Sequence, residues 1–111
     1  MMGRREQKKG RRGEIELSKI LNERGYNTRP GAAVSFGSEP DVVGLDGIHV
    51  EIKRRECHDI PAALRQAAED AAFFRDGIPA LFTRGNRERW RIVMDIDEWL
   101  KLYDAYYKQK N

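Results

Sequence analysis

The chain has little of what marks secreted, membrane or repeat proteins. Its 111 residues contain one cysteine, Cys57, so no disulfide can form within the chain. No apolar run is long enough to cross a bilayer, and no apolar stretch follows the basic N-terminus as in a signal peptide. Internal repeats and low-complexity tracts are also missing. We therefore expect a soluble, cytoplasmic protein with one domain.

Charge, in contrast, is abundant and unevenly distributed. Charged residues make up 35% of the chain, and the formal net charge is +3. Basic residues gather in three clusters, at 4–12, 53–55 and 84–91. A solvated surface would explain any single cluster, but three together favour nucleic acid, because neutralised phosphates release condensed counterions. The candidate DNA contacts are Arg11, Arg12, Arg54, Arg55, Arg84, Arg87 and Arg89.

Hydrophobic periodicity predicts one α/β domain over residues 13–111, preceded by a basic arm or frayed helix start at 1–12. Leu17 and Leu21 repeat at helical spacing, and Gly25 marks the end of a first helix. The remaining patterns predict strands at 26–29, 41–45, 48–53, 78–83 and 90–94, and helices at 59–75 and from 96 onward. The order α-β-β-β-α-β-β-α predicts a mixed sheet flanked by helices.

The second and third helices show recognisable start signals and apolar stripes. Asp59 is a suitable N-cap for the second helix, and Asp95 with Glu98 forms a capping box for the third. The stripe expected to pack against the sheet is Leu64, Ala68, Ala71 and Phe74 in the second helix. In the third helix it is Ile96, Trp99, Leu100, Tyr103 and Tyr107.

The strand at 48–53 carries the most informative pattern. Its odd-numbered residues, His49, Glu51 and Lys53, share one polar face, and its even-numbered residues are all isoleucine or valine. A two-residue turn would place Asp41 opposite Ile52, on the other face. A three-residue loop over 45–47, with glycine at position 47 in the left-handed conformation, places Asp41 opposite Glu51. Because glycine is the residue that such a loop needs, we predict this second register.

Two carboxylates this close repel each other unless a cation lies between them. Mg²⁺ suits such a pair, since it prefers oxygen ligands and keeps several waters. We expect Asp41, Glu51 and the backbone carbonyl of Ile52 to bind it, with Lys53 orienting a water or accepting its proton. Glu14 faces inward on the first helix and is a further ligand candidate, although an interaction with the positive helix end would explain it equally well.

These residues resemble a known signature. Pro40-Asp41 followed by Glu51-Ile52-Lys53 is similar to the PD-(D/E)XK motif of the restriction-endonuclease-like nucleases. The pattern Gly10-x-x-x-Glu14-x-Glu16-Leu17, continued to Gly25-Tyr26, resembles the first helix of archaeal-type Holliday junction resolvases, and the likeness covers residues 10–94.

That resemblance implies a function and a site. It implies a metal-dependent endonuclease using Mg²⁺, or Mn²⁺ in its place, and acting as a homodimer on DNA. Glu14, Asp41 and Glu51 would bind the metal, and Lys53 would be catalytic. The resolvases also carry a serine before the aspartate strand, and Ser35 and Ser38 both fit that place.

The leading hypothesis is therefore a Mg²⁺-dependent endodeoxyribonuclease. One alternative is a catalytically inactive DNA-binding domain on the same fold, and another is an interaction protein whose motif match is a coincidence. His49 is interpreted as a bystander. Cys57, His58 and Asp59 lack a second ligand group at zinc-binding spacing. The substrate structure, whether junction, flap, duplex or RNA, is left open.

Overall fold

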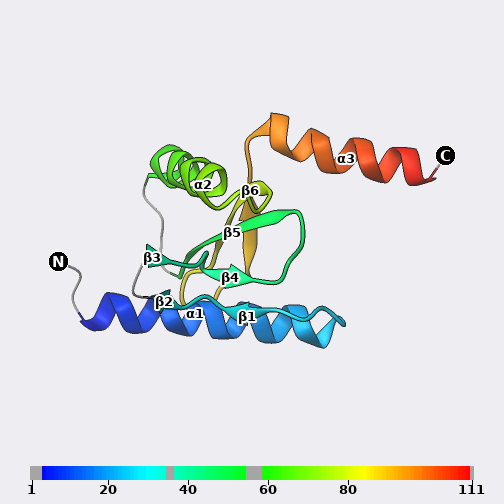
Figure 1. The fold of residues 1–111 in the computed structure, drawn as a ribbon. Helices are drawn as coiled ribbons and strands as arrows, with labels where there is room; N and C mark the ends of the chain where they lie inside the picture. Colours follow the sequence, from blue (N-terminus) through cyan, green and yellow to red (C-terminus); the bar gives the residue numbers. More distant parts are fainter. Residues whose placement is uncertain (1–3, 35–36, 55–58, 111) are drawn as a thin grey trace.

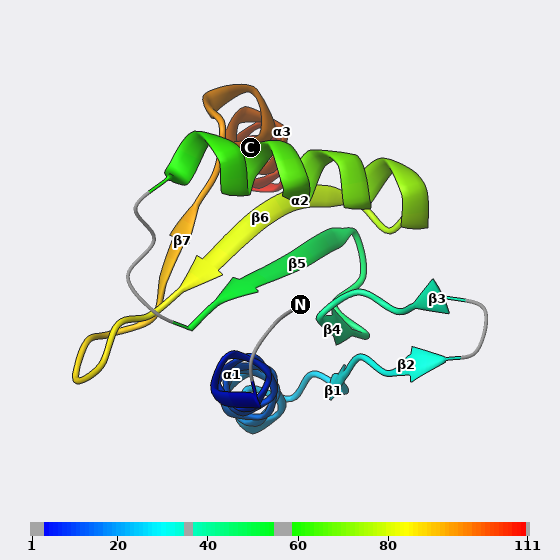
Figure 2. The ribbon, with the colours of Figure 1, turned by 90° about the vertical axis from the view of Figure 1, so that its left-hand side faces the viewer.

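A five-stranded mixed sheet separates α1 from α2 (Figures 1 and 2). The computed structural model describes residues 4–34, 37–54 and 59–110. The helices are α1 Arg4–Glu23, α2 Ile60–Phe74 and α3 Ile96–Lys110. The strands are β1 Arg29–Pro30, β2 Ala33–Val34, β3 Gly37–Ser38, β4 Val42–Val43, β5 Ile48–Lys53, β6 Ile78–Thr83 and β7 Arg91–Val93.

The main sheet has the order β1-β4-β5-β6-β7. Strands β5 and β6 run parallel, joined by α2, and the neighbouring pairs are antiparallel. Without β2 and β3, the chain order is α-β-β-β-α-β-β-α, which confirms the predicted single α/β domain with a mixed sheet. Strands β2 and β3 form a separate antiparallel pair between the predicted strands at 26–29 and 41–45.

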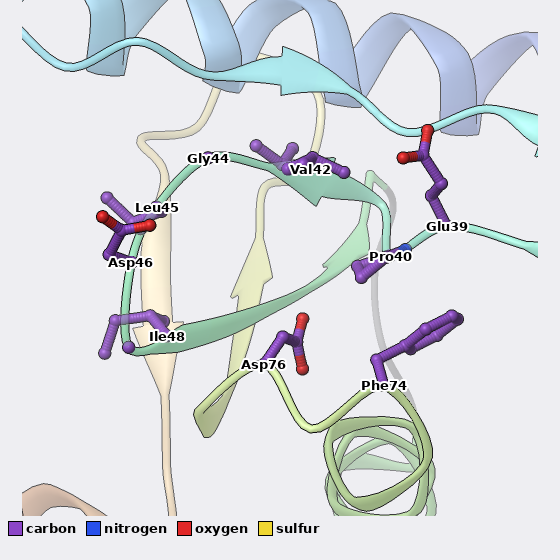
Figure 3. A pocket seen from close by; sticks show the side chains of 11 residues that line it. Glu39, Pro40, Val42, Gly44, Leu45, Asp46, Ile48, Phe74 and Asp76 are labelled. Carbon is purple, nitrogen blue, oxygen red and sulfur yellow. The ribbon is translucent and has the colours of Figure 1, made fainter.

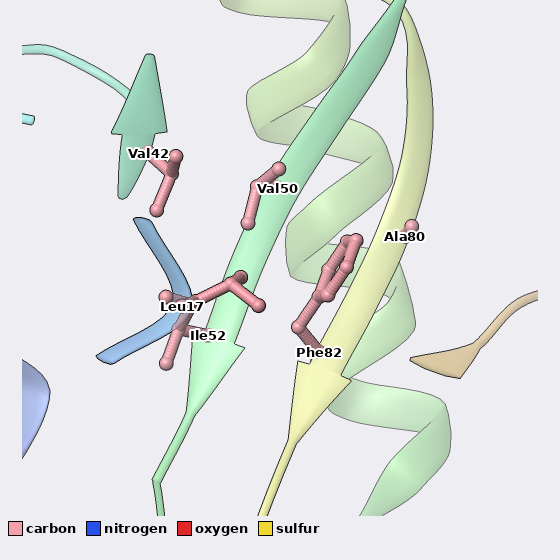
Figure 4. Packing of buried hydrophobic residues seen from close by; sticks show 6 residues of the cluster. All are labelled: Leu17, Val42, Val50, Ile52, Ala80 and Phe82. Carbon is pink, nitrogen blue, oxygen red and sulfur yellow. The ribbon is translucent and has the colours of Figure 1, made fainter. Parts of the chain in front are cut away.

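The core lies mainly on the α1 face of the sheet (Figure 4). Its buried residues are Leu17, Val42, Val50, Ile52, Ala80 and Phe82. Helix α1 approaches β5 closely, and a Cβ on Gly13 would lie 3.0 Å from both Ile52 Cγ2 and Arg54 Cβ. Glycine within this helix therefore permits the close packing.

The first helix begins earlier than expected. Residues 4–12, expected to form an arm or a frayed start, are helical from Arg4 onward. This segment is rich in arginine, lysine, glutamate and glutamine, which have good helix propensity, and it contains no proline. Residue 13 is thus an interior position of the helix and not its beginning.

Helix α2 begins as predicted but packs through a different stripe. The Asp59 carboxylate accepts a hydrogen bond of 2.9 Å from the backbone N–H of Ala62. The buried residues are Ala63, Ala67 and Ala71. Of the predicted stripe, Ala71 is buried, Leu64 and Phe74 are half-buried, and only Ala68 is exposed. An alanine-rich helix offers several apolar faces, and the smallest residues lie closest to the sheet. The helix ends at Arg75, which adopts the left-handed conformation, and its N–H donates to Ala71 O at 2.8 Å.

Helix α3 does not pack as the sequence suggested. Its expected stripe is present, but none of its residues is buried. The helix leads away from the sheet toward the C-terminus (Figure 1), and the molecule is 49 Å along its longest axis. The five stripe residues expected in the core are all exposed, with Ile96 at 64% and Trp99 at 45%.

Candidate metal and active site

The register of the β4–β5 hairpin decides where Asp41 lies. Val42 pairs with Val50 in an antiparallel ladder, so Asp41 lies opposite Glu51 on the same face of the sheet. Gly47 has a φ of 84°, the left-handed conformation that the three-residue loop requires. The predicted register is therefore confirmed, and a two-residue turn is excluded.

Asp41 is the electrostatic centre of this group. Burial raises the pKa of Asp41 to about 7, and the negative charges of Glu51 and Glu14 act in the same direction. A hydrogen bond of 2.8 Å from the Ile52 N–H to Asp41 Oδ2 and the positive charge of Lys53 oppose this rise. Glu14, Glu51 and Lys53 thus all lie close enough to affect the charge state of Asp41.

Glu14 reaches the site from α1. Its side chain is 17% exposed and accepts a hydrogen bond of 3.3 Å from Arg11. Burial raises the pKa of Glu14, although the hydrogen bond and charge of Arg11 act against this. Arg11 also donates to the carbonyl of Gly31 at 3.0 Å, which connects this turn of α1 to the residue after β1.

Glu16, two residues after Glu14 on α1, has a structural role. Its Oε2 accepts hydrogen bonds of 3.0 Å from both Arg54 and Arg84. Although burial alone would raise the pKa of Glu16, these two guanidinium groups hold it below its ordinary value. The Arg54 side chain is only 9% exposed. Arg54 therefore connects α1 to the end of β5, and its role as a DNA contact stays a prediction.

The other proposed DNA contacts are found in two places. In the β6–β7 loop, Arg87 and Arg89 are exposed, whereas Arg84 is half-buried and bonded to Glu16; Arg11 and Arg12 are exposed on α1. The loop begins beside Lys53, because the N–H of residue 84 donates to the Lys53 carbonyl at 3.2 Å. Arg55 and Ser35 lie outside the described residues. Residue 38 belongs to β3, and the structure does not place its side chain.

A polar cavity of about 210 Å³ opens next to this site, between the sheet and the end of α2. Its walls include Asp41 and Glu51, together with two residues that the motif does not contain, His49 and Asp70. The ligand atoms of His49, Glu51 and Asp70 lie within 4.8 Å of one another. Three side chains in the described part of the chain thus come together as a possible metal-binding group.

His49 was interpreted as a bystander, but it is one of the most buried polar residues. It is 1% exposed, and its Nδ1 lies 2.9 Å from both carboxylate oxygens of Asp76. Its Nε2 lies 3.4 Å from Glu51 Oε1. Burial acts against protonation, yet the bonds with Glu51 and Asp76 raise the pKa of His49. Strand alternation placed His49 beside Glu51, whereas nothing local showed that Asp70 would face them.

A larger, more apolar hollow of about 440 Å³ adjoins this cavity, and the walls of both include Glu39, Pro40 and Phe74. Figure 3 shows Phe74 and Asp76 from the end of α2 across from Pro40 and Ile48. Among the described residues, this larger hollow contains no second group of metal-ligating side chains. The metal-ligating side chains of the described residues therefore gather in the smaller cavity.

Comparisons with protein-family models, curated proteins and solved structures give no match to this chain. None of the described helices is long and apolar enough to cross a membrane.

Proposed function

We propose that this chain is a Mg²⁺-dependent endonuclease that hydrolyses DNA phosphodiester bonds, with a PD-(D/E)XK site on a restriction-endonuclease-like core. The observation that carries the proposal is the β4–β5 register, in which Asp41 lies opposite Glu51. Lys53 follows Glu51 at the next position on the same strand face. A coincidental motif match would have no reason to bring these groups together.

The donor set suits a hard divalent cation. Asp41, Glu51 and Glu14 supply carboxylate oxygens, and their mutual repulsion is part of what raises the pKa of Asp41. The Ile52 N–H points to Asp41, and the carbonyl of the same residue lies along the same strand edge. When bound there, Mg²⁺ would polarise a phosphodiester oxygen and lower the pKa of an attacking water.

We assign Lys53 the role of the catalytic amine. As an ammonium group it offsets the negative charge that develops on the phosphate, and it donates hydrogen bonds that orient the attacking water. Asp41 and Glu51, which both line the smaller cavity, would hold the metal. The Ile52 N–H fixes one oxygen of Asp41 and leaves the other free for this role.

Positive charge around Lys53 supports DNA as the substrate. The exposed residues Arg87 and Arg89 belong to a loop whose first residue bonds to the Lys53 carbonyl. Arg12 on α1 is exposed one position before Gly13, which packs against β5 near the same end of the strand. A backbone passing Lys53 would therefore meet cations from two elements.

A cleavage assay tests the proposal directly. Linear, flapped and four-way DNA are incubated with Mg²⁺, Mn²⁺ or EDTA, using the parent, Lys53→Ala, Asp41→Asn and the control Lys101→Ala on α3. We expect metal-dependent cutting by the parent and the control, and a loss on the order of 100-fold or more in the two site variants, which still fold and bind DNA. Parent-like cutting by Lys53→Ala contradicts the assigned role of the amine. DNA binding without cleavage by the parent would favour the inactive-domain alternative.

We also propose that the enzyme acts as a homodimer. The support is the apolar surface of α3, whose large side chains are exposed in the single chain. The branched or linear nature of the DNA is decided by the same cleavage assay.

A further inference from the structure

We propose that His49, Glu51 and Asp70 form a second cation site, which takes a first-row transition-metal dication such as Zn²⁺ and not Mg²⁺. This goes beyond the proposed nuclease function, because His49 and Asp70 do not belong to the motif. The two sites share Glu51 and are otherwise built from different side chains.

The first support is geometric. The three ligand atoms come from two elements, β5 and α2, and lie within 4.8 Å of one another. Two ligands of the same zinc ion, each at about 2.1 Å, are separated by at most about 4.2 Å. Since His49 Nε2 and Glu51 Oε1 are already 3.4 Å apart, the half-buried Asp70 is the side chain that must move closer when the ion binds. The adjoining cavity of about 210 Å³ has room for the waters that complete the coordination.

The second support is the orientation of the imidazole ring. A carboxylate can only accept hydrogen bonds, so the Nδ1–H of His49 donates to Asp76, 2.9 Å away. In the neutral ring this leaves the lone pair on Nε2, the atom that lies 3.4 Å from Glu51. A carboxylate behind a histidine is the usual outer partner of a metal-binding imidazole. Phe74 stacks on the ring at 6.2 Å between centroids and fixes its plane.

The third support is the charge of the cavity. Its described lining contains the carboxylates of Glu39, Asp41, Glu51 and Asp70 and no lysine or arginine. Arg29 neutralises Glu39, with nitrogen–oxygen distances of 2.7 and 2.8 Å. Even when Asp41 keeps its proton and His49 is protonated, the carboxyl groups of Glu51 and Asp70 still outnumber the single imidazole. A buried imidazolium alone therefore does not neutralise the negative charge of the cavity lining.

The ligand types select the ion. Mg²⁺ prefers oxygen donors in an octahedron and gives up its waters reluctantly. An imidazole nitrogen with two carboxylates suits Zn²⁺ and its first-row neighbours. With Mg²⁺ in excess, the oxygen-only site around Asp41 is satisfied, and added Zn²⁺ then reports on the histidine site.

Calorimetric titration of the folded chain with Zn²⁺, in buffer with millimolar Mg²⁺, tests the proposal without DNA or cleavage. We expect one Zn²⁺ ion per chain. Asp70→Asn should weaken binding by about 10-fold or more, and Asp76→Asn by about 10- to 100-fold through the lost orientation of His49. Glu69→Gln, which changes the exposed neighbour of Asp70 on α2, should remain within about threefold of the parent.

Two results would overturn the proposal: no Zn²⁺ uptake by the folded parent, or equal affinity in Asp70→Asn and the parent. Asp70 is half-buried and bonds within its own helix to Gln66, so its variant is expected to fold, and circular dichroism checks this. Normal cleavage with failed Zn²⁺ binding rejects the second site alone. Zn²⁺ binding without cleavage rejects the nuclease alone.

Discussion

Asp41 is a carboxyl group held among like charges and partly removed from water. Its pKa of about 7 in the folded chain compares with 3.8 for the free side chain. Between these two values the folded protein keeps a proton that the unfolded chain has released. Without metal, the free energy of unfolding should therefore fall as pH rises from about 4 to about 7, by up to about 1.4 kcal/mol per pKa unit.

This dependence can be measured by thermal melting in EDTA at pH 5 and pH 8. The groups that face Asp41 are Glu51 and Glu14, which strengthen the effect, and Lys53, which weakens it. We expect a lower melting temperature at pH 8 in the parent and a smaller difference in Asp41→Asn. Asp46→Asn, which removes an exposed acid from the same hairpin, is the control. A parent that gains stability toward pH 8 as much as Asp41→Asn would show that Asp41 is not held in this way.

Metal binding should reverse the sign of that dependence. Mg²⁺ requires the ionised carboxylate, so its affinity rises as Asp41 loses its proton. The stabilisation by added Mg²⁺ is therefore expected to be small at pH 5 and large at pH 8, measured as the shift in melting temperature relative to EDTA. The same shift at both pH values would place the ion away from Asp41.

Among the elements, the contact between the β4–β5 loop and the start of β6 holds the hairpin in place. Gly77 has a φ of 130°, and a Cβ there would lie 2.2 Å from the backbone carbon and oxygen of Gly47. The N–H of Ile78 donates to that same oxygen at 2.8 Å. Substitution at residue 77 should therefore strain the backbone and also push the hairpin away from β6.

Gly77→Ala and Gly25→Ala separate these two effects. Gly25 has a φ of 100° but nothing within 4 Å of an added Cβ, so its variant reports the cost of backbone conformation alone. We expect Gly25→Ala to lose about 1 kcal/mol in denaturant unfolding and Gly77→Ala clearly more, about 2–4 kcal/mol. Equal losses in the two variants would show that the contact with Gly47 contributes little.

The sequence was most informative where a single local rule applied. Alternation along β5 placed Glu51 and Lys53 together, and the glycine at position 47 selected the loop that brings Asp41 to them. Asp59 identified the start of α2 because its side chain bonds within one helical turn. The order along the chain of the five main-sheet strands and the three helices also followed from such local signals.

Features that depend on distant contacts could not be predicted. Any of several stripes in the alanine-rich α2 could have faced the sheet, so neither the burial of Ala67 nor the approach of Asp70 to His49 was visible. A cluster of charged residues predicts an exposed surface. The Arg54 side chain is nevertheless largely buried, because it bonds to Glu16, 38 residues away in sequence. In both cases the partner lies on another element.

At the scale of the whole molecule, α3 is the anomaly. It has a regular apolar stripe, as the sequence indicated, but the chain itself does not cover it. Trp99 stacks on Tyr103 at 5.1 Å between ring centroids, and both side chains are more than two-fifths exposed. A stripe of this kind normally packs against another surface, which in a homodimer is supplied by the second copy.

Light scattering after size-exclusion chromatography tests the dimer. The parent is expected at about twice the 12.9 kDa of one chain, and Trp99→Ser combined with Tyr103→Ser at about once that mass. Lys101→Ala, which changes a side chain bonded within the helix to Glu98, should remain dimeric. Because α3 buries none of its residues, the double variant should keep the fold of the sheet and its melting temperature at low concentration. A parent that is monomeric at about 100 μM, or a dimer that survives the double substitution, would remove α3 as the contact between copies.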